Sequence, residues 1–414
     1  MLWSLVHKSA PFVILSLGGD SLAEYSSIRQ YRRVLSVAKS IGLQPRITSL
    51  AVRRQSSDKL SITCISFRFI LSSLSNPSSL QTLVLRQLKV VPAHQRLILS
   101  IPTLRKLVLE FSEFIPTSIA LPTSSITTLC LGEQRRLAAV EHTLTLLANS
   151  LETLEFSNEI YHLLANIPLP RLTSLTSPLL PKKMVHFSSL SALTRLSVNI
   201  IGDFHLDKIV IDPTVLPNLH YLCTWWTLGA LLIAGRPVRV FRLPGQMSTM
   251  DDAQNWLWLV EYVSRLASVA SHLEELQIPL SVPICETIEI LIEYLPRITR
   301  LHLWSWEGEG PPQVRIRGNP AKRNQVQHPS LKEVVISFTP KIQTLATYPL
   351  WRSPGWVLPR AECNEVFETV IGMCAMAEVV RIGALMPWDD EKDIPPEWIM
   401  EMRKAEDGTW VERK

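Results

Sequence analysis

Several kinds of sequence feature that mark enzymes are scarce or missing in this chain of 414 residues. It has no G-x-S-x-G, H-E-x-x-H or Walker-type sequence, so the signatures of a serine nucleophile, a catalytic zinc and a phosphate loop are missing. Glycine occurs only 15 times. Gly308 and Gly310 lie in a proline-rich stretch, without the strand and helix that flank a phosphate loop. We therefore expect that the chain is not an enzyme and carries no cofactor.

The cysteines and histidines form no pattern typical of a metal or disulfide site. None of the six cysteines belongs to a C-x-x-C pair, and the ten histidines show no metal-ligand spacing. Neither a zinc site nor a dense disulfide framework fits this distribution. No Asn-x-Ser/Thr glycosylation acceptor is present either, because Asn76 is followed by Pro77. We expect reduced thiols, no bound metal and a cytoplasmic or nuclear location.

Long apolar runs and concentrated charge are also missing. No apolar run reaches the roughly 18 residues of a membrane span, so we expect no membrane association. The short apolar run at 11–17 is weakly similar to part of a signal peptide, but it ends at Gly18-Gly19 and no cleavage sequence follows. The net charge is only +5, and the basic residues are scattered. Proteins that bind nucleic acid usually concentrate such residues on one face, so we expect no nucleic-acid partner.

One local basic cluster consists of Arg315, Arg317, Lys322 and Arg323. We interpret it as part of a solvated loop. A nuclear-import signal or a patch for an acidic partner is the next alternative, and a nucleic-acid contact is the last.

A short phrase recurs along the chain: an aliphatic residue, two variable residues, an aliphatic residue, one variable residue and a third apolar residue. Most copies begin 19 to 26 residues after the previous one, which is the period of leucine-rich repeats. A repeat of this size cannot bury its own apolar edge, so neighbouring copies must stack around one continuous core. The copies, weaker ones included, begin at residues 47, 80, 104, 126, 151, 172, 193, 219, 238, 273, 298 and 331.

These repeats predict an α/β fold, an irregular leucine-rich-repeat solenoid (horseshoe) with a parallel concave sheet and outer helices or loops. We expect three regions: residues 1–44 as an N-terminal helical cap or remnant, 45–385 as the solenoid, and 386–414 as a C-terminal cap with a charged tail. The solenoid would contain a loop insertion at about 305–329. Apolar residues at helical spacing predict helices at 27–41, 138–150, 285–295 and 363–373, and one from about 249 to 267.

Several segments resemble the fungal F-box/leucine-rich-repeat-like proteins, over about residues 27–385. They include Gln-Pro-Arg-Ile-Thr-Ser-Leu at 44–50, Leu-Pro-Asn-Leu-His-Tyr-Leu at 216–222, Gly-Arg-Pro-Val at 235–238, Leu-Glu-Glu-Leu at 273–276 and Tyr-Leu-Pro-Arg-Ile at 294–298. The resemblance implies substrate recognition for a cullin-type ubiquitin ligase. Two features depart from it. Residues 1–44 do not match an F-box, and Leu88, Ser112 and Gln134 replace the asparagine or cysteine that closes each regular repeat.

The variable positions of each phrase should face away from the core, because side chains alternate along a strand. In the second half of the chain these positions are rich in aromatic residues and arginine, which are typical of protein interfaces. The alternative is that the aromatic residues fill an irregular core or contact a loop. The predicted partner-binding residues are Tyr221, Trp225, Arg242, Arg300, His302 and Trp304.

The sequence thus favours a non-catalytic protein-interaction module. One hypothesis places it in a ubiquitin ligase, although the ligase adaptor has no F-box to bind here. The other is a stand-alone repeat protein that binds an unknown protein target.

Overall fold

The computed structural model describes residues 14–17, 49–53, 80–133, 136–157, 160–177, 190–198, 211–244, 252–279, 283–306, 327–339, 360–384 and 397–413. The chain divides into two compact units, which are described separately. The first unit comprises Met1–Gly202 and Thr214–Asn218, and the second comprises Asp203–Pro213 and Leu219–Lys414.

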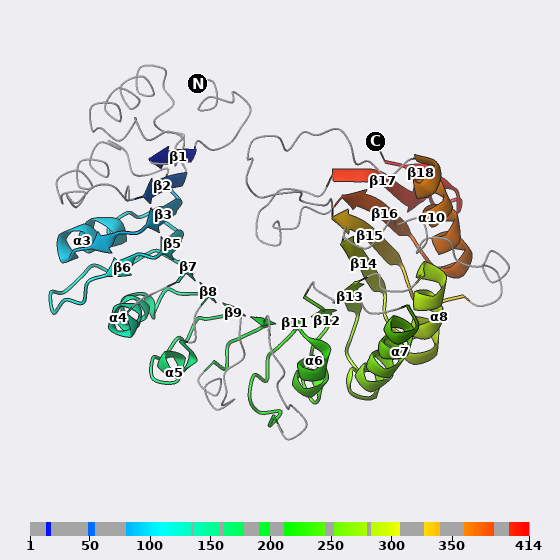
Figure 1. The fold of residues 1–414 in the computed structure, drawn as a ribbon, viewed down its shortest axis with the longest axis horizontal. Helices are drawn as coiled ribbons and strands as arrows, with labels where there is room; N and C mark the ends of the chain where they lie inside the picture. The colour runs from blue at the N-terminus through cyan, green and yellow to red at the C-terminus, as the bar shows by residue number, and fades with distance from the viewer. Residues whose placement is uncertain are drawn as a thin grey trace, which may run out of the picture. The chain divides into compact units, whose positions relative to one another are not determined.

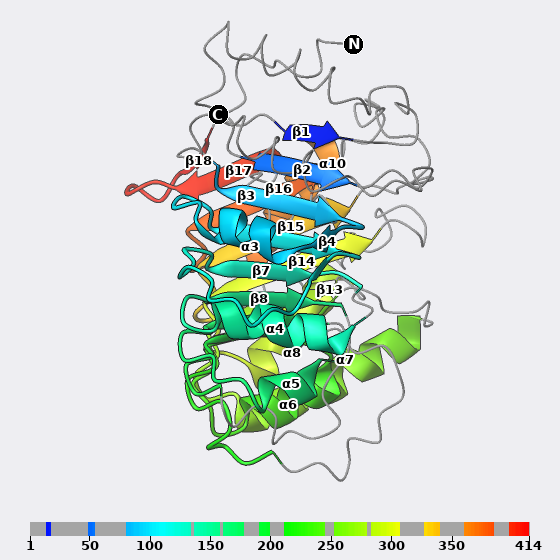
Figure 2. The ribbon, with the colours of Figure 1, turned by 90° about the vertical axis from the view of Figure 1, so that its left-hand side faces the viewer.

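The first unit contains a parallel sheet in which each strand pairs with the next copy of the repeated phrase. Figure 2 shows its first strands lying side by side in chain order. Its strands, in sheet order, are β1 (Ile14–Leu17), β2 (Ser49–Arg53), β3 (Thr82–Arg86), β5 (Lys106–Glu110), β7 (Thr128–Leu131), β8 (Thr153–Phe156), β9 (Ser174–Ser177) and β10 (Arg195–Val198). The helices are α3 (Pro92–Leu99), α4 (Leu137–Leu147) and the short α5 (Tyr161–Leu164).

The repeated apolar residues of the first unit are aligned from strand to strand. Leu83 of β3 pairs with Leu107 of β5, which pairs with Leu129 of β7. All three are fully buried. The core is therefore a stack of leucine rows between the sheet and the helices, as the spacing of the phrase predicts.

A second, small sheet continues the turns of this unit. It pairs β4 (Lys89–Val90) with β6 (Glu113–Phe114) in parallel. Gln95 of α3 is fully buried and donates from Nε2 to the carbonyls of Val90 and Ile115, at 2.8 and 2.7 Å. This amide satisfies backbone acceptors on two successive turns, which stabilises their stacking.

Ser112 makes a similar link between repeats. Its buried hydroxyl donates to the carbonyl of Leu85 at 2.8 Å and accepts from the backbone N–H of Leu88 at 2.9 Å. In a regular leucine-rich repeat an asparagine or cysteine occupies this position in the pattern. A shorter hydroxyl side chain thus binds the backbone of the preceding turn here.

The strands of the second unit are parallel to one another over the first six. The last two strands are antiparallel, so the direction changes between β16 and β17. The strands, in order, are β11 (Tyr221–Thr224), β12 (Val240–Arg242), β13 (Glu275–Pro279), β14 (Arg300–Trp306), β15 (Glu333–Thr339), β16 (Val379–Ala384), β17 (Glu397–Lys404) and β18 (Trp410–Glu412). The described helices of this unit are α6 (Trp226–Ile233), α7 (Asp252–Val269), α8 (Ile284–Tyr294) and α10 (Arg360–Met373), and Figure 1 shows them on one side of these strands.

The core of the second unit lies between this sheet and its helices. Phe241 of β12 is fully buried, and its ring lies against Gly229 of α6, where an added Cβ would be only 2.6 Å from the ring. Tyr262 of α7 packs on the same ring, with centroids 6.1 Å apart. Helix α6 can therefore approach β12 closely because position 229 has no side chain.

An arginine side chain caps the C-terminal end of α6. Arg236 is 3% exposed and donates to the carbonyls of Leu232, Ala234 and Asp212, at 3.2, 3.1 and 2.7 Å. Burial lowers the pKa of Arg236, whereas the charge of Asp212 raises it. A positive group at the end of a helix also complements the helix dipole. This arginine is thus part of the packing of the unit.

The α/β class and the parallel sheet predicted from the phrase are confirmed. The helices predicted at 138–150, 249–267, 285–295 and 363–373 are present as α4, α7, α8 and α10. Trp256, an apolar residue of the helix predicted from about 249 to 267, is 42% exposed and does not pack in the core. Strand β1, which lies in the short apolar run at 11–17 and pairs with β2, was not predicted from the sequence.

The tail region contains strands as well. β17 and β18 form an antiparallel hairpin that extends the sheet within the stretch interpreted as a cap and charged tail. The helix predicted at 27–41 lies outside the described residues, as does most of the predicted insertion at 305–329, whose first two residues belong to β14. Among the described residues, no helix combines the length and apolar character that a membrane span requires.

Candidate binding face

We call the side of the second unit's sheet that faces away from the described helices the open face. Because the strands are in register, its side chains form rows that cross the strands. The first row contains Tyr221, Val240, Glu275, Arg300, Glu333, Val379 and Arg403; the second contains Cys223, Arg242, Gln277, His302, Val335, Arg381 and Glu401. A shorter third row contains Pro279, Trp304, Ser337 and Gly383.

Five of the six residues predicted to bind a partner fall in these rows. The exception is Trp225, which follows β11 and directly precedes α6, with its carbonyl accepting from Gly229 N–H at 2.8 Å. The remaining five come from three strands: Tyr221 from β11, Arg242 from β12, and Arg300, His302 and Trp304 from β14. Most of the predicted partner-binding residues therefore lie on one face.

Trp304 does not have the exposure expected of a surface residue. It is only 6% exposed, although the alternation of β14 places it on the open-face side. The neighbouring His302 is partly buried, and its Nε2 lies 2.7 Å from the Ser337 hydroxyl of β15. Trp304 thus matches the alternative that aromatic residues here are packed inside, whereas Tyr221, Arg242 and Arg300 keep part of their surface exposed.

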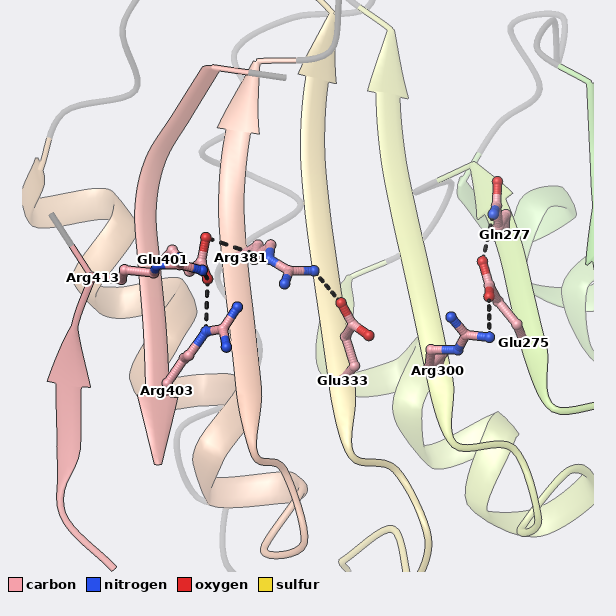
Figure 3. Close-up of polar contacts among 8 residues, drawn as sticks. All are labelled: Glu275, Gln277, Arg300, Glu333, Arg381, Glu401, Arg403 and Arg413. Carbon is pink, nitrogen blue, oxygen red and sulfur yellow. Dashed lines mark hydrogen bonds and ion pairs between the residues drawn. The ribbon is translucent and has the colours of Figure 1, made fainter. Parts of the chain in front are cut away.

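The central part of the open face contains an ion pair between two strands. Arg300 Nη2 on β14 lies 3.1 Å from Glu275 Oε2 on β13. Glu275 also accepts a hydrogen bond of 2.6 Å from Gln277 Nε2, two residues along its own strand. Figure 3 shows the three side chains together. Both oxygens of Glu275 are therefore occupied by neighbours on the sheet.

A larger cluster lies toward the C-terminal end of the same face (Figure 3). Glu401 of β17 is surrounded by three arginines: Arg403 Nε at 2.8 Å, Arg381 Nε at 3.6 Å and Arg413 Nη1 at 3.6 Å. Arg381 also forms an ion pair with Glu333 of β15. Four polypeptide segments are thus joined by charged side chains.

The environment of Glu401 changes the pKa of its carboxyl group. Burial is the largest single influence and favours the neutral form, which would raise the pKa. The hydrogen bond from Arg403 and the positive charges of Arg381, Arg403 and Arg413 act in the opposite direction and outweigh it. The pKa of Glu401 is therefore lowered, and this group is ionised at neutral pH.

Sequence reasoning missed this second cluster. Arg381 occupies a variable position in a further copy of the phrase, formed by Ala377, Val380 and Ile382, all fully buried. Its small first residue made the copy hard to recognise. Glu333 occupies the third position of the copy that begins at residue 331, so its outward orientation could have been predicted from the same rule. Glu401 carried no such signal because β17 runs antiparallel and does not repeat the phrase.

The corresponding face of the first unit is different in character. Among the residues that the structure describes, one ion pair links its neighbouring strands there, between Arg86 Nε and Glu110 Oε2 at 2.6 Å. Small hydroxyl side chains occupy much of the rest, including Thr128, Thr153 and Ser174, which pair in one row. The described residues therefore concentrate interlinked charge on the open face of the second unit.

Within the described residues, no group of three or more histidine, cysteine, aspartate or glutamate side chains could hold a metal ion. The five described cysteines, Cys130, Cys223, Cys285, Cys363 and Cys374, are buried and form no disulfide with one another. Burial raises the pKa of the Cys374 thiol to about 12. That thiol is therefore protonated at neutral pH.

Comparison with known proteins does not assign the chain to a family. No protein-family model and no curated protein matches it. Among solved structures, it is similar to a protein from Bacteroides fragilis determined by the Northeast Structural Genomics Consortium. The two chains are 12% identical, and the match covers 70% of this chain and 68% of that one, with a TM-score of 0.24. A score this low supports no argument about fold or function.

Proposed function

We propose that the chain is a non-catalytic protein-interaction module and that the open face of the second unit binds the partner. The observation that carries this proposal is the row arrangement. Charged and aromatic side chains from separate strands share one side of a hydrogen-bonded sheet. Because the backbone ladder fixes these positions, a partner meets a surface that needs little ordering on binding.

The residue types support the same function. Tyrosine and arginine are enriched among the residues that contribute most to binding energy at protein interfaces. Tyr221, Arg242 and Arg300 each keep part of their side chain exposed. Of the six residues named from the sequence, these three are the best candidates for direct contact, together with His302. Trp304 lies on the same side of the sheet but is buried, so it would pack among the side chains of the face and not contact the partner directly.

The finer architecture belongs to the same proposal. We interpret the strands of both units, with their in-register apolar rows and their helices, as parts of an irregular leucine-rich-repeat solenoid. The resemblance to fungal F-box/leucine-rich-repeat-like proteins favours substrate recognition in a cullin-type ubiquitin ligase. The alternative is a stand-alone repeat-type binding protein with no ligase subunits, located in the cytoplasm or nucleus.

The proposal can be tested by affinity purification from cells of the source organism, with quantitative mass spectrometry of the bound proteins. The test variant is Arg300→Glu. The matched control is Arg265→Glu, which reverses an exposed charge on helix α7 that is paired with Glu261. We expect a protein that binds the wild type and the Arg265→Glu variant but is reduced by about tenfold with Arg300→Glu.

Two results would decide between the alternatives. Adaptor and cullin subunits that copurify with the target would support the ligase context, whereas a target without them would support a stand-alone module. Equal capture of every bound protein by both variants, with both shown to be folded by circular dichroism, would contradict the assignment of the open face.

A further inference from the structure

We propose that the segment of the partner that binds the open face is acidic and that its carboxylates lie across the arginine-bearing rows. This inference rests on the proposed function and adds the chemistry of the partner. The observations that carry it are the unequal exposure of the charged groups, the carboxylate already held by the face, and the direction in which the rows run.

Two acidic side chains of the face, Glu275 and Glu401, are more buried than the exposed arginines that pair with them, whereas Arg381 and Glu333 are recessed alike, at 24% and 25% exposed. Glu275 and Glu401 are 16% and 12% exposed, whereas their partners Arg300 and Arg403 are 48% and 47% exposed. Arg413, which also pairs with Glu401, is 65% exposed. A molecule that approaches the face therefore meets guanidinium groups first, and the glutamates lie beneath them.

The exposed guanidinium groups retain hydrogen-bonding capacity. Each guanidinium carries five N–H donors in a planar fork that matches a carboxylate. Arg300 contacts Glu275 through Nη2, and Arg413 contacts Glu401 through Nη1. Arg403 contacts Glu401 through Nε. The other nitrogens of each fork can therefore receive a second carboxylate from a partner.

The face already holds a carboxylate of its own chain at the point where arginines converge. Glu401 lies within 3.6 Å of guanidinium nitrogens from Arg381, Arg403 and Arg413. Arg381 is recessed, at 24% exposed, and bridges Glu401 and Glu333. This geometry shows that the position stabilises one carboxylate, and a partner's carboxylate would bind beside it on the two more exposed arginines.

The direction of the rows sets the form of the partner segment. Arg242 lies on β12 and Arg403 on β17, five strand spacings apart in the sheet order. At roughly 4.8 Å per spacing this span is about 24 Å, which an extended segment of about seven residues would cover. We therefore expect a short acidic segment that crosses the strands, with Arg300 near the middle of its path.

The first test uses a fluorescent poly-glutamate peptide as the probe and the full chain as the binder, measured by fluorescence anisotropy at low and moderate salt. The double variant Arg403→Gln/Arg413→Gln removes the two more exposed guanidinium groups beside Glu401. Its matched control is Arg136→Gln/Arg171→Gln, which removes two arginines of similar exposure from the first unit. We expect the test variant to bind about three- to tenfold more weakly than the control.

A second variant predicts the opposite change. Glu401→Gln removes the internal carboxylate and leaves its three arginines available, so poly-glutamate should bind more tightly than to the wild type. The control is Glu378→Gln, which removes an exposed carboxylate paired with Lys332 elsewhere in the same unit. Thermal melting verifies that each variant is folded at the temperature of the binding measurement.

Several results would overturn the inference. Equal loss of affinity in the two double variants would show that the peptide binds through net charge alone. Poly-lysine or a single-stranded oligonucleotide could instead bind more tightly than poly-glutamate and lose this binding in Arg403→Gln/Arg413→Gln. The face would then bind another class of partner and not an acidic protein segment. A natural partner could also require Arg300 for binding but cross-link through a segment without acidic residues. This result would refute the inference that the bound segment is acidic, and the proposed function would stand.

Discussion

Arg381 and Glu401 join the last parallel strand of the second unit to the antiparallel strand beside it, with Arg381 Nε 3.6 Å from Glu401 Oε2. The two residues are direct neighbours in the register of β16 and β17. Opposite charges that face each other across strands stabilise the pairing. The ion pair therefore links the last strand of the repeated pattern to the C-terminal hairpin.

The lowered pKa of Glu401 predicts a pH-dependent contribution to stability. A carboxyl group whose pKa is lower in the folded state stabilises the fold above its unfolded pKa of about 4.3, and this stability is lost as the pH falls through the folded value. Wild type should be more stable than Glu401→Gln at pH 7, and the difference should shrink below about pH 4. Urea denaturation at several pH values measures it. A difference that stays constant down to acid pH would contradict the role of the charge.

Arg236 should contribute strongly to the stability of the second unit. Arg236→Met leaves the carbonyls at the end of α6 and the carbonyl of Asp212 without this donor, so we expect a loss of about 2–4 kcal/mol in the free energy of unfolding. Arg239→Met is the control, because Arg239 forms an exposed pair with Glu274 and should change stability by less than about 1 kcal/mol. Chemical denaturation distinguishes the two. Similar losses in both variants would refute the capping role.

Gly229 is predicted to be necessary for the contact between α6 and β12. Alanine is the better helix former by up to about 1 kcal/mol. Its Cβ would nevertheless lie 2.6 and 2.7 Å from two ring atoms of Phe241, so we expect Gly229→Ala to reduce stability by about 1–3 kcal/mol. In a double-mutant cycle, Phe241→Leu should relieve part of this loss. If the effects of Gly229→Ala and Phe241→Leu on stability were strictly additive, contact between the added Cβ and the Phe241 ring would not explain the loss.

Ser112 is predicted to hold adjacent turns of the first unit together. Ser112→Ala leaves the Leu88 N–H and the Leu85 carbonyl without this partner, so we expect a loss of about 1–3 kcal/mol. Ser100→Ala serves as the control, because the exposed Ser100 hydroxyl donates only within its own turn, to Leu97. Denaturation of both variants tests the link. No difference between them would mean that other groups replace the Ser112 hydroxyl.

Much of the fold could be predicted because the repeated phrase is a local pattern with a simple physical meaning. Leucines such as Leu107 and Leu276 recur at strand spacing, and each is fully buried where the phrase places it. β17 and β18 were not predicted because their charged and apolar residues do not follow the phrase. β1 was missed because its short apolar run, at 11–17, was compared with a signal peptide.

The candidate face was predicted in part for the same reason. Alternation along a strand located Arg242, Arg300 and His302, since it depends only on neighbouring residues. Alternation could not foresee that Trp304 would be buried, because burial depends on the rest of the unit. It also could not find Glu401, whose place beside Arg381 depends on a strand from a distant part of the sequence.

The central claim is that the open face of the second unit binds a protein partner. Its most direct test is a photo-cross-linking amino acid at Val335, between His302 and Arg381 in the second row, compared with the same amino acid at Leu257 on α7, which is 64% exposed. The account predicts that the partner captured in an Arg300-dependent manner cross-links from position 335 and not from position 257. Cross-linking of that partner from position 257 alone would contradict it.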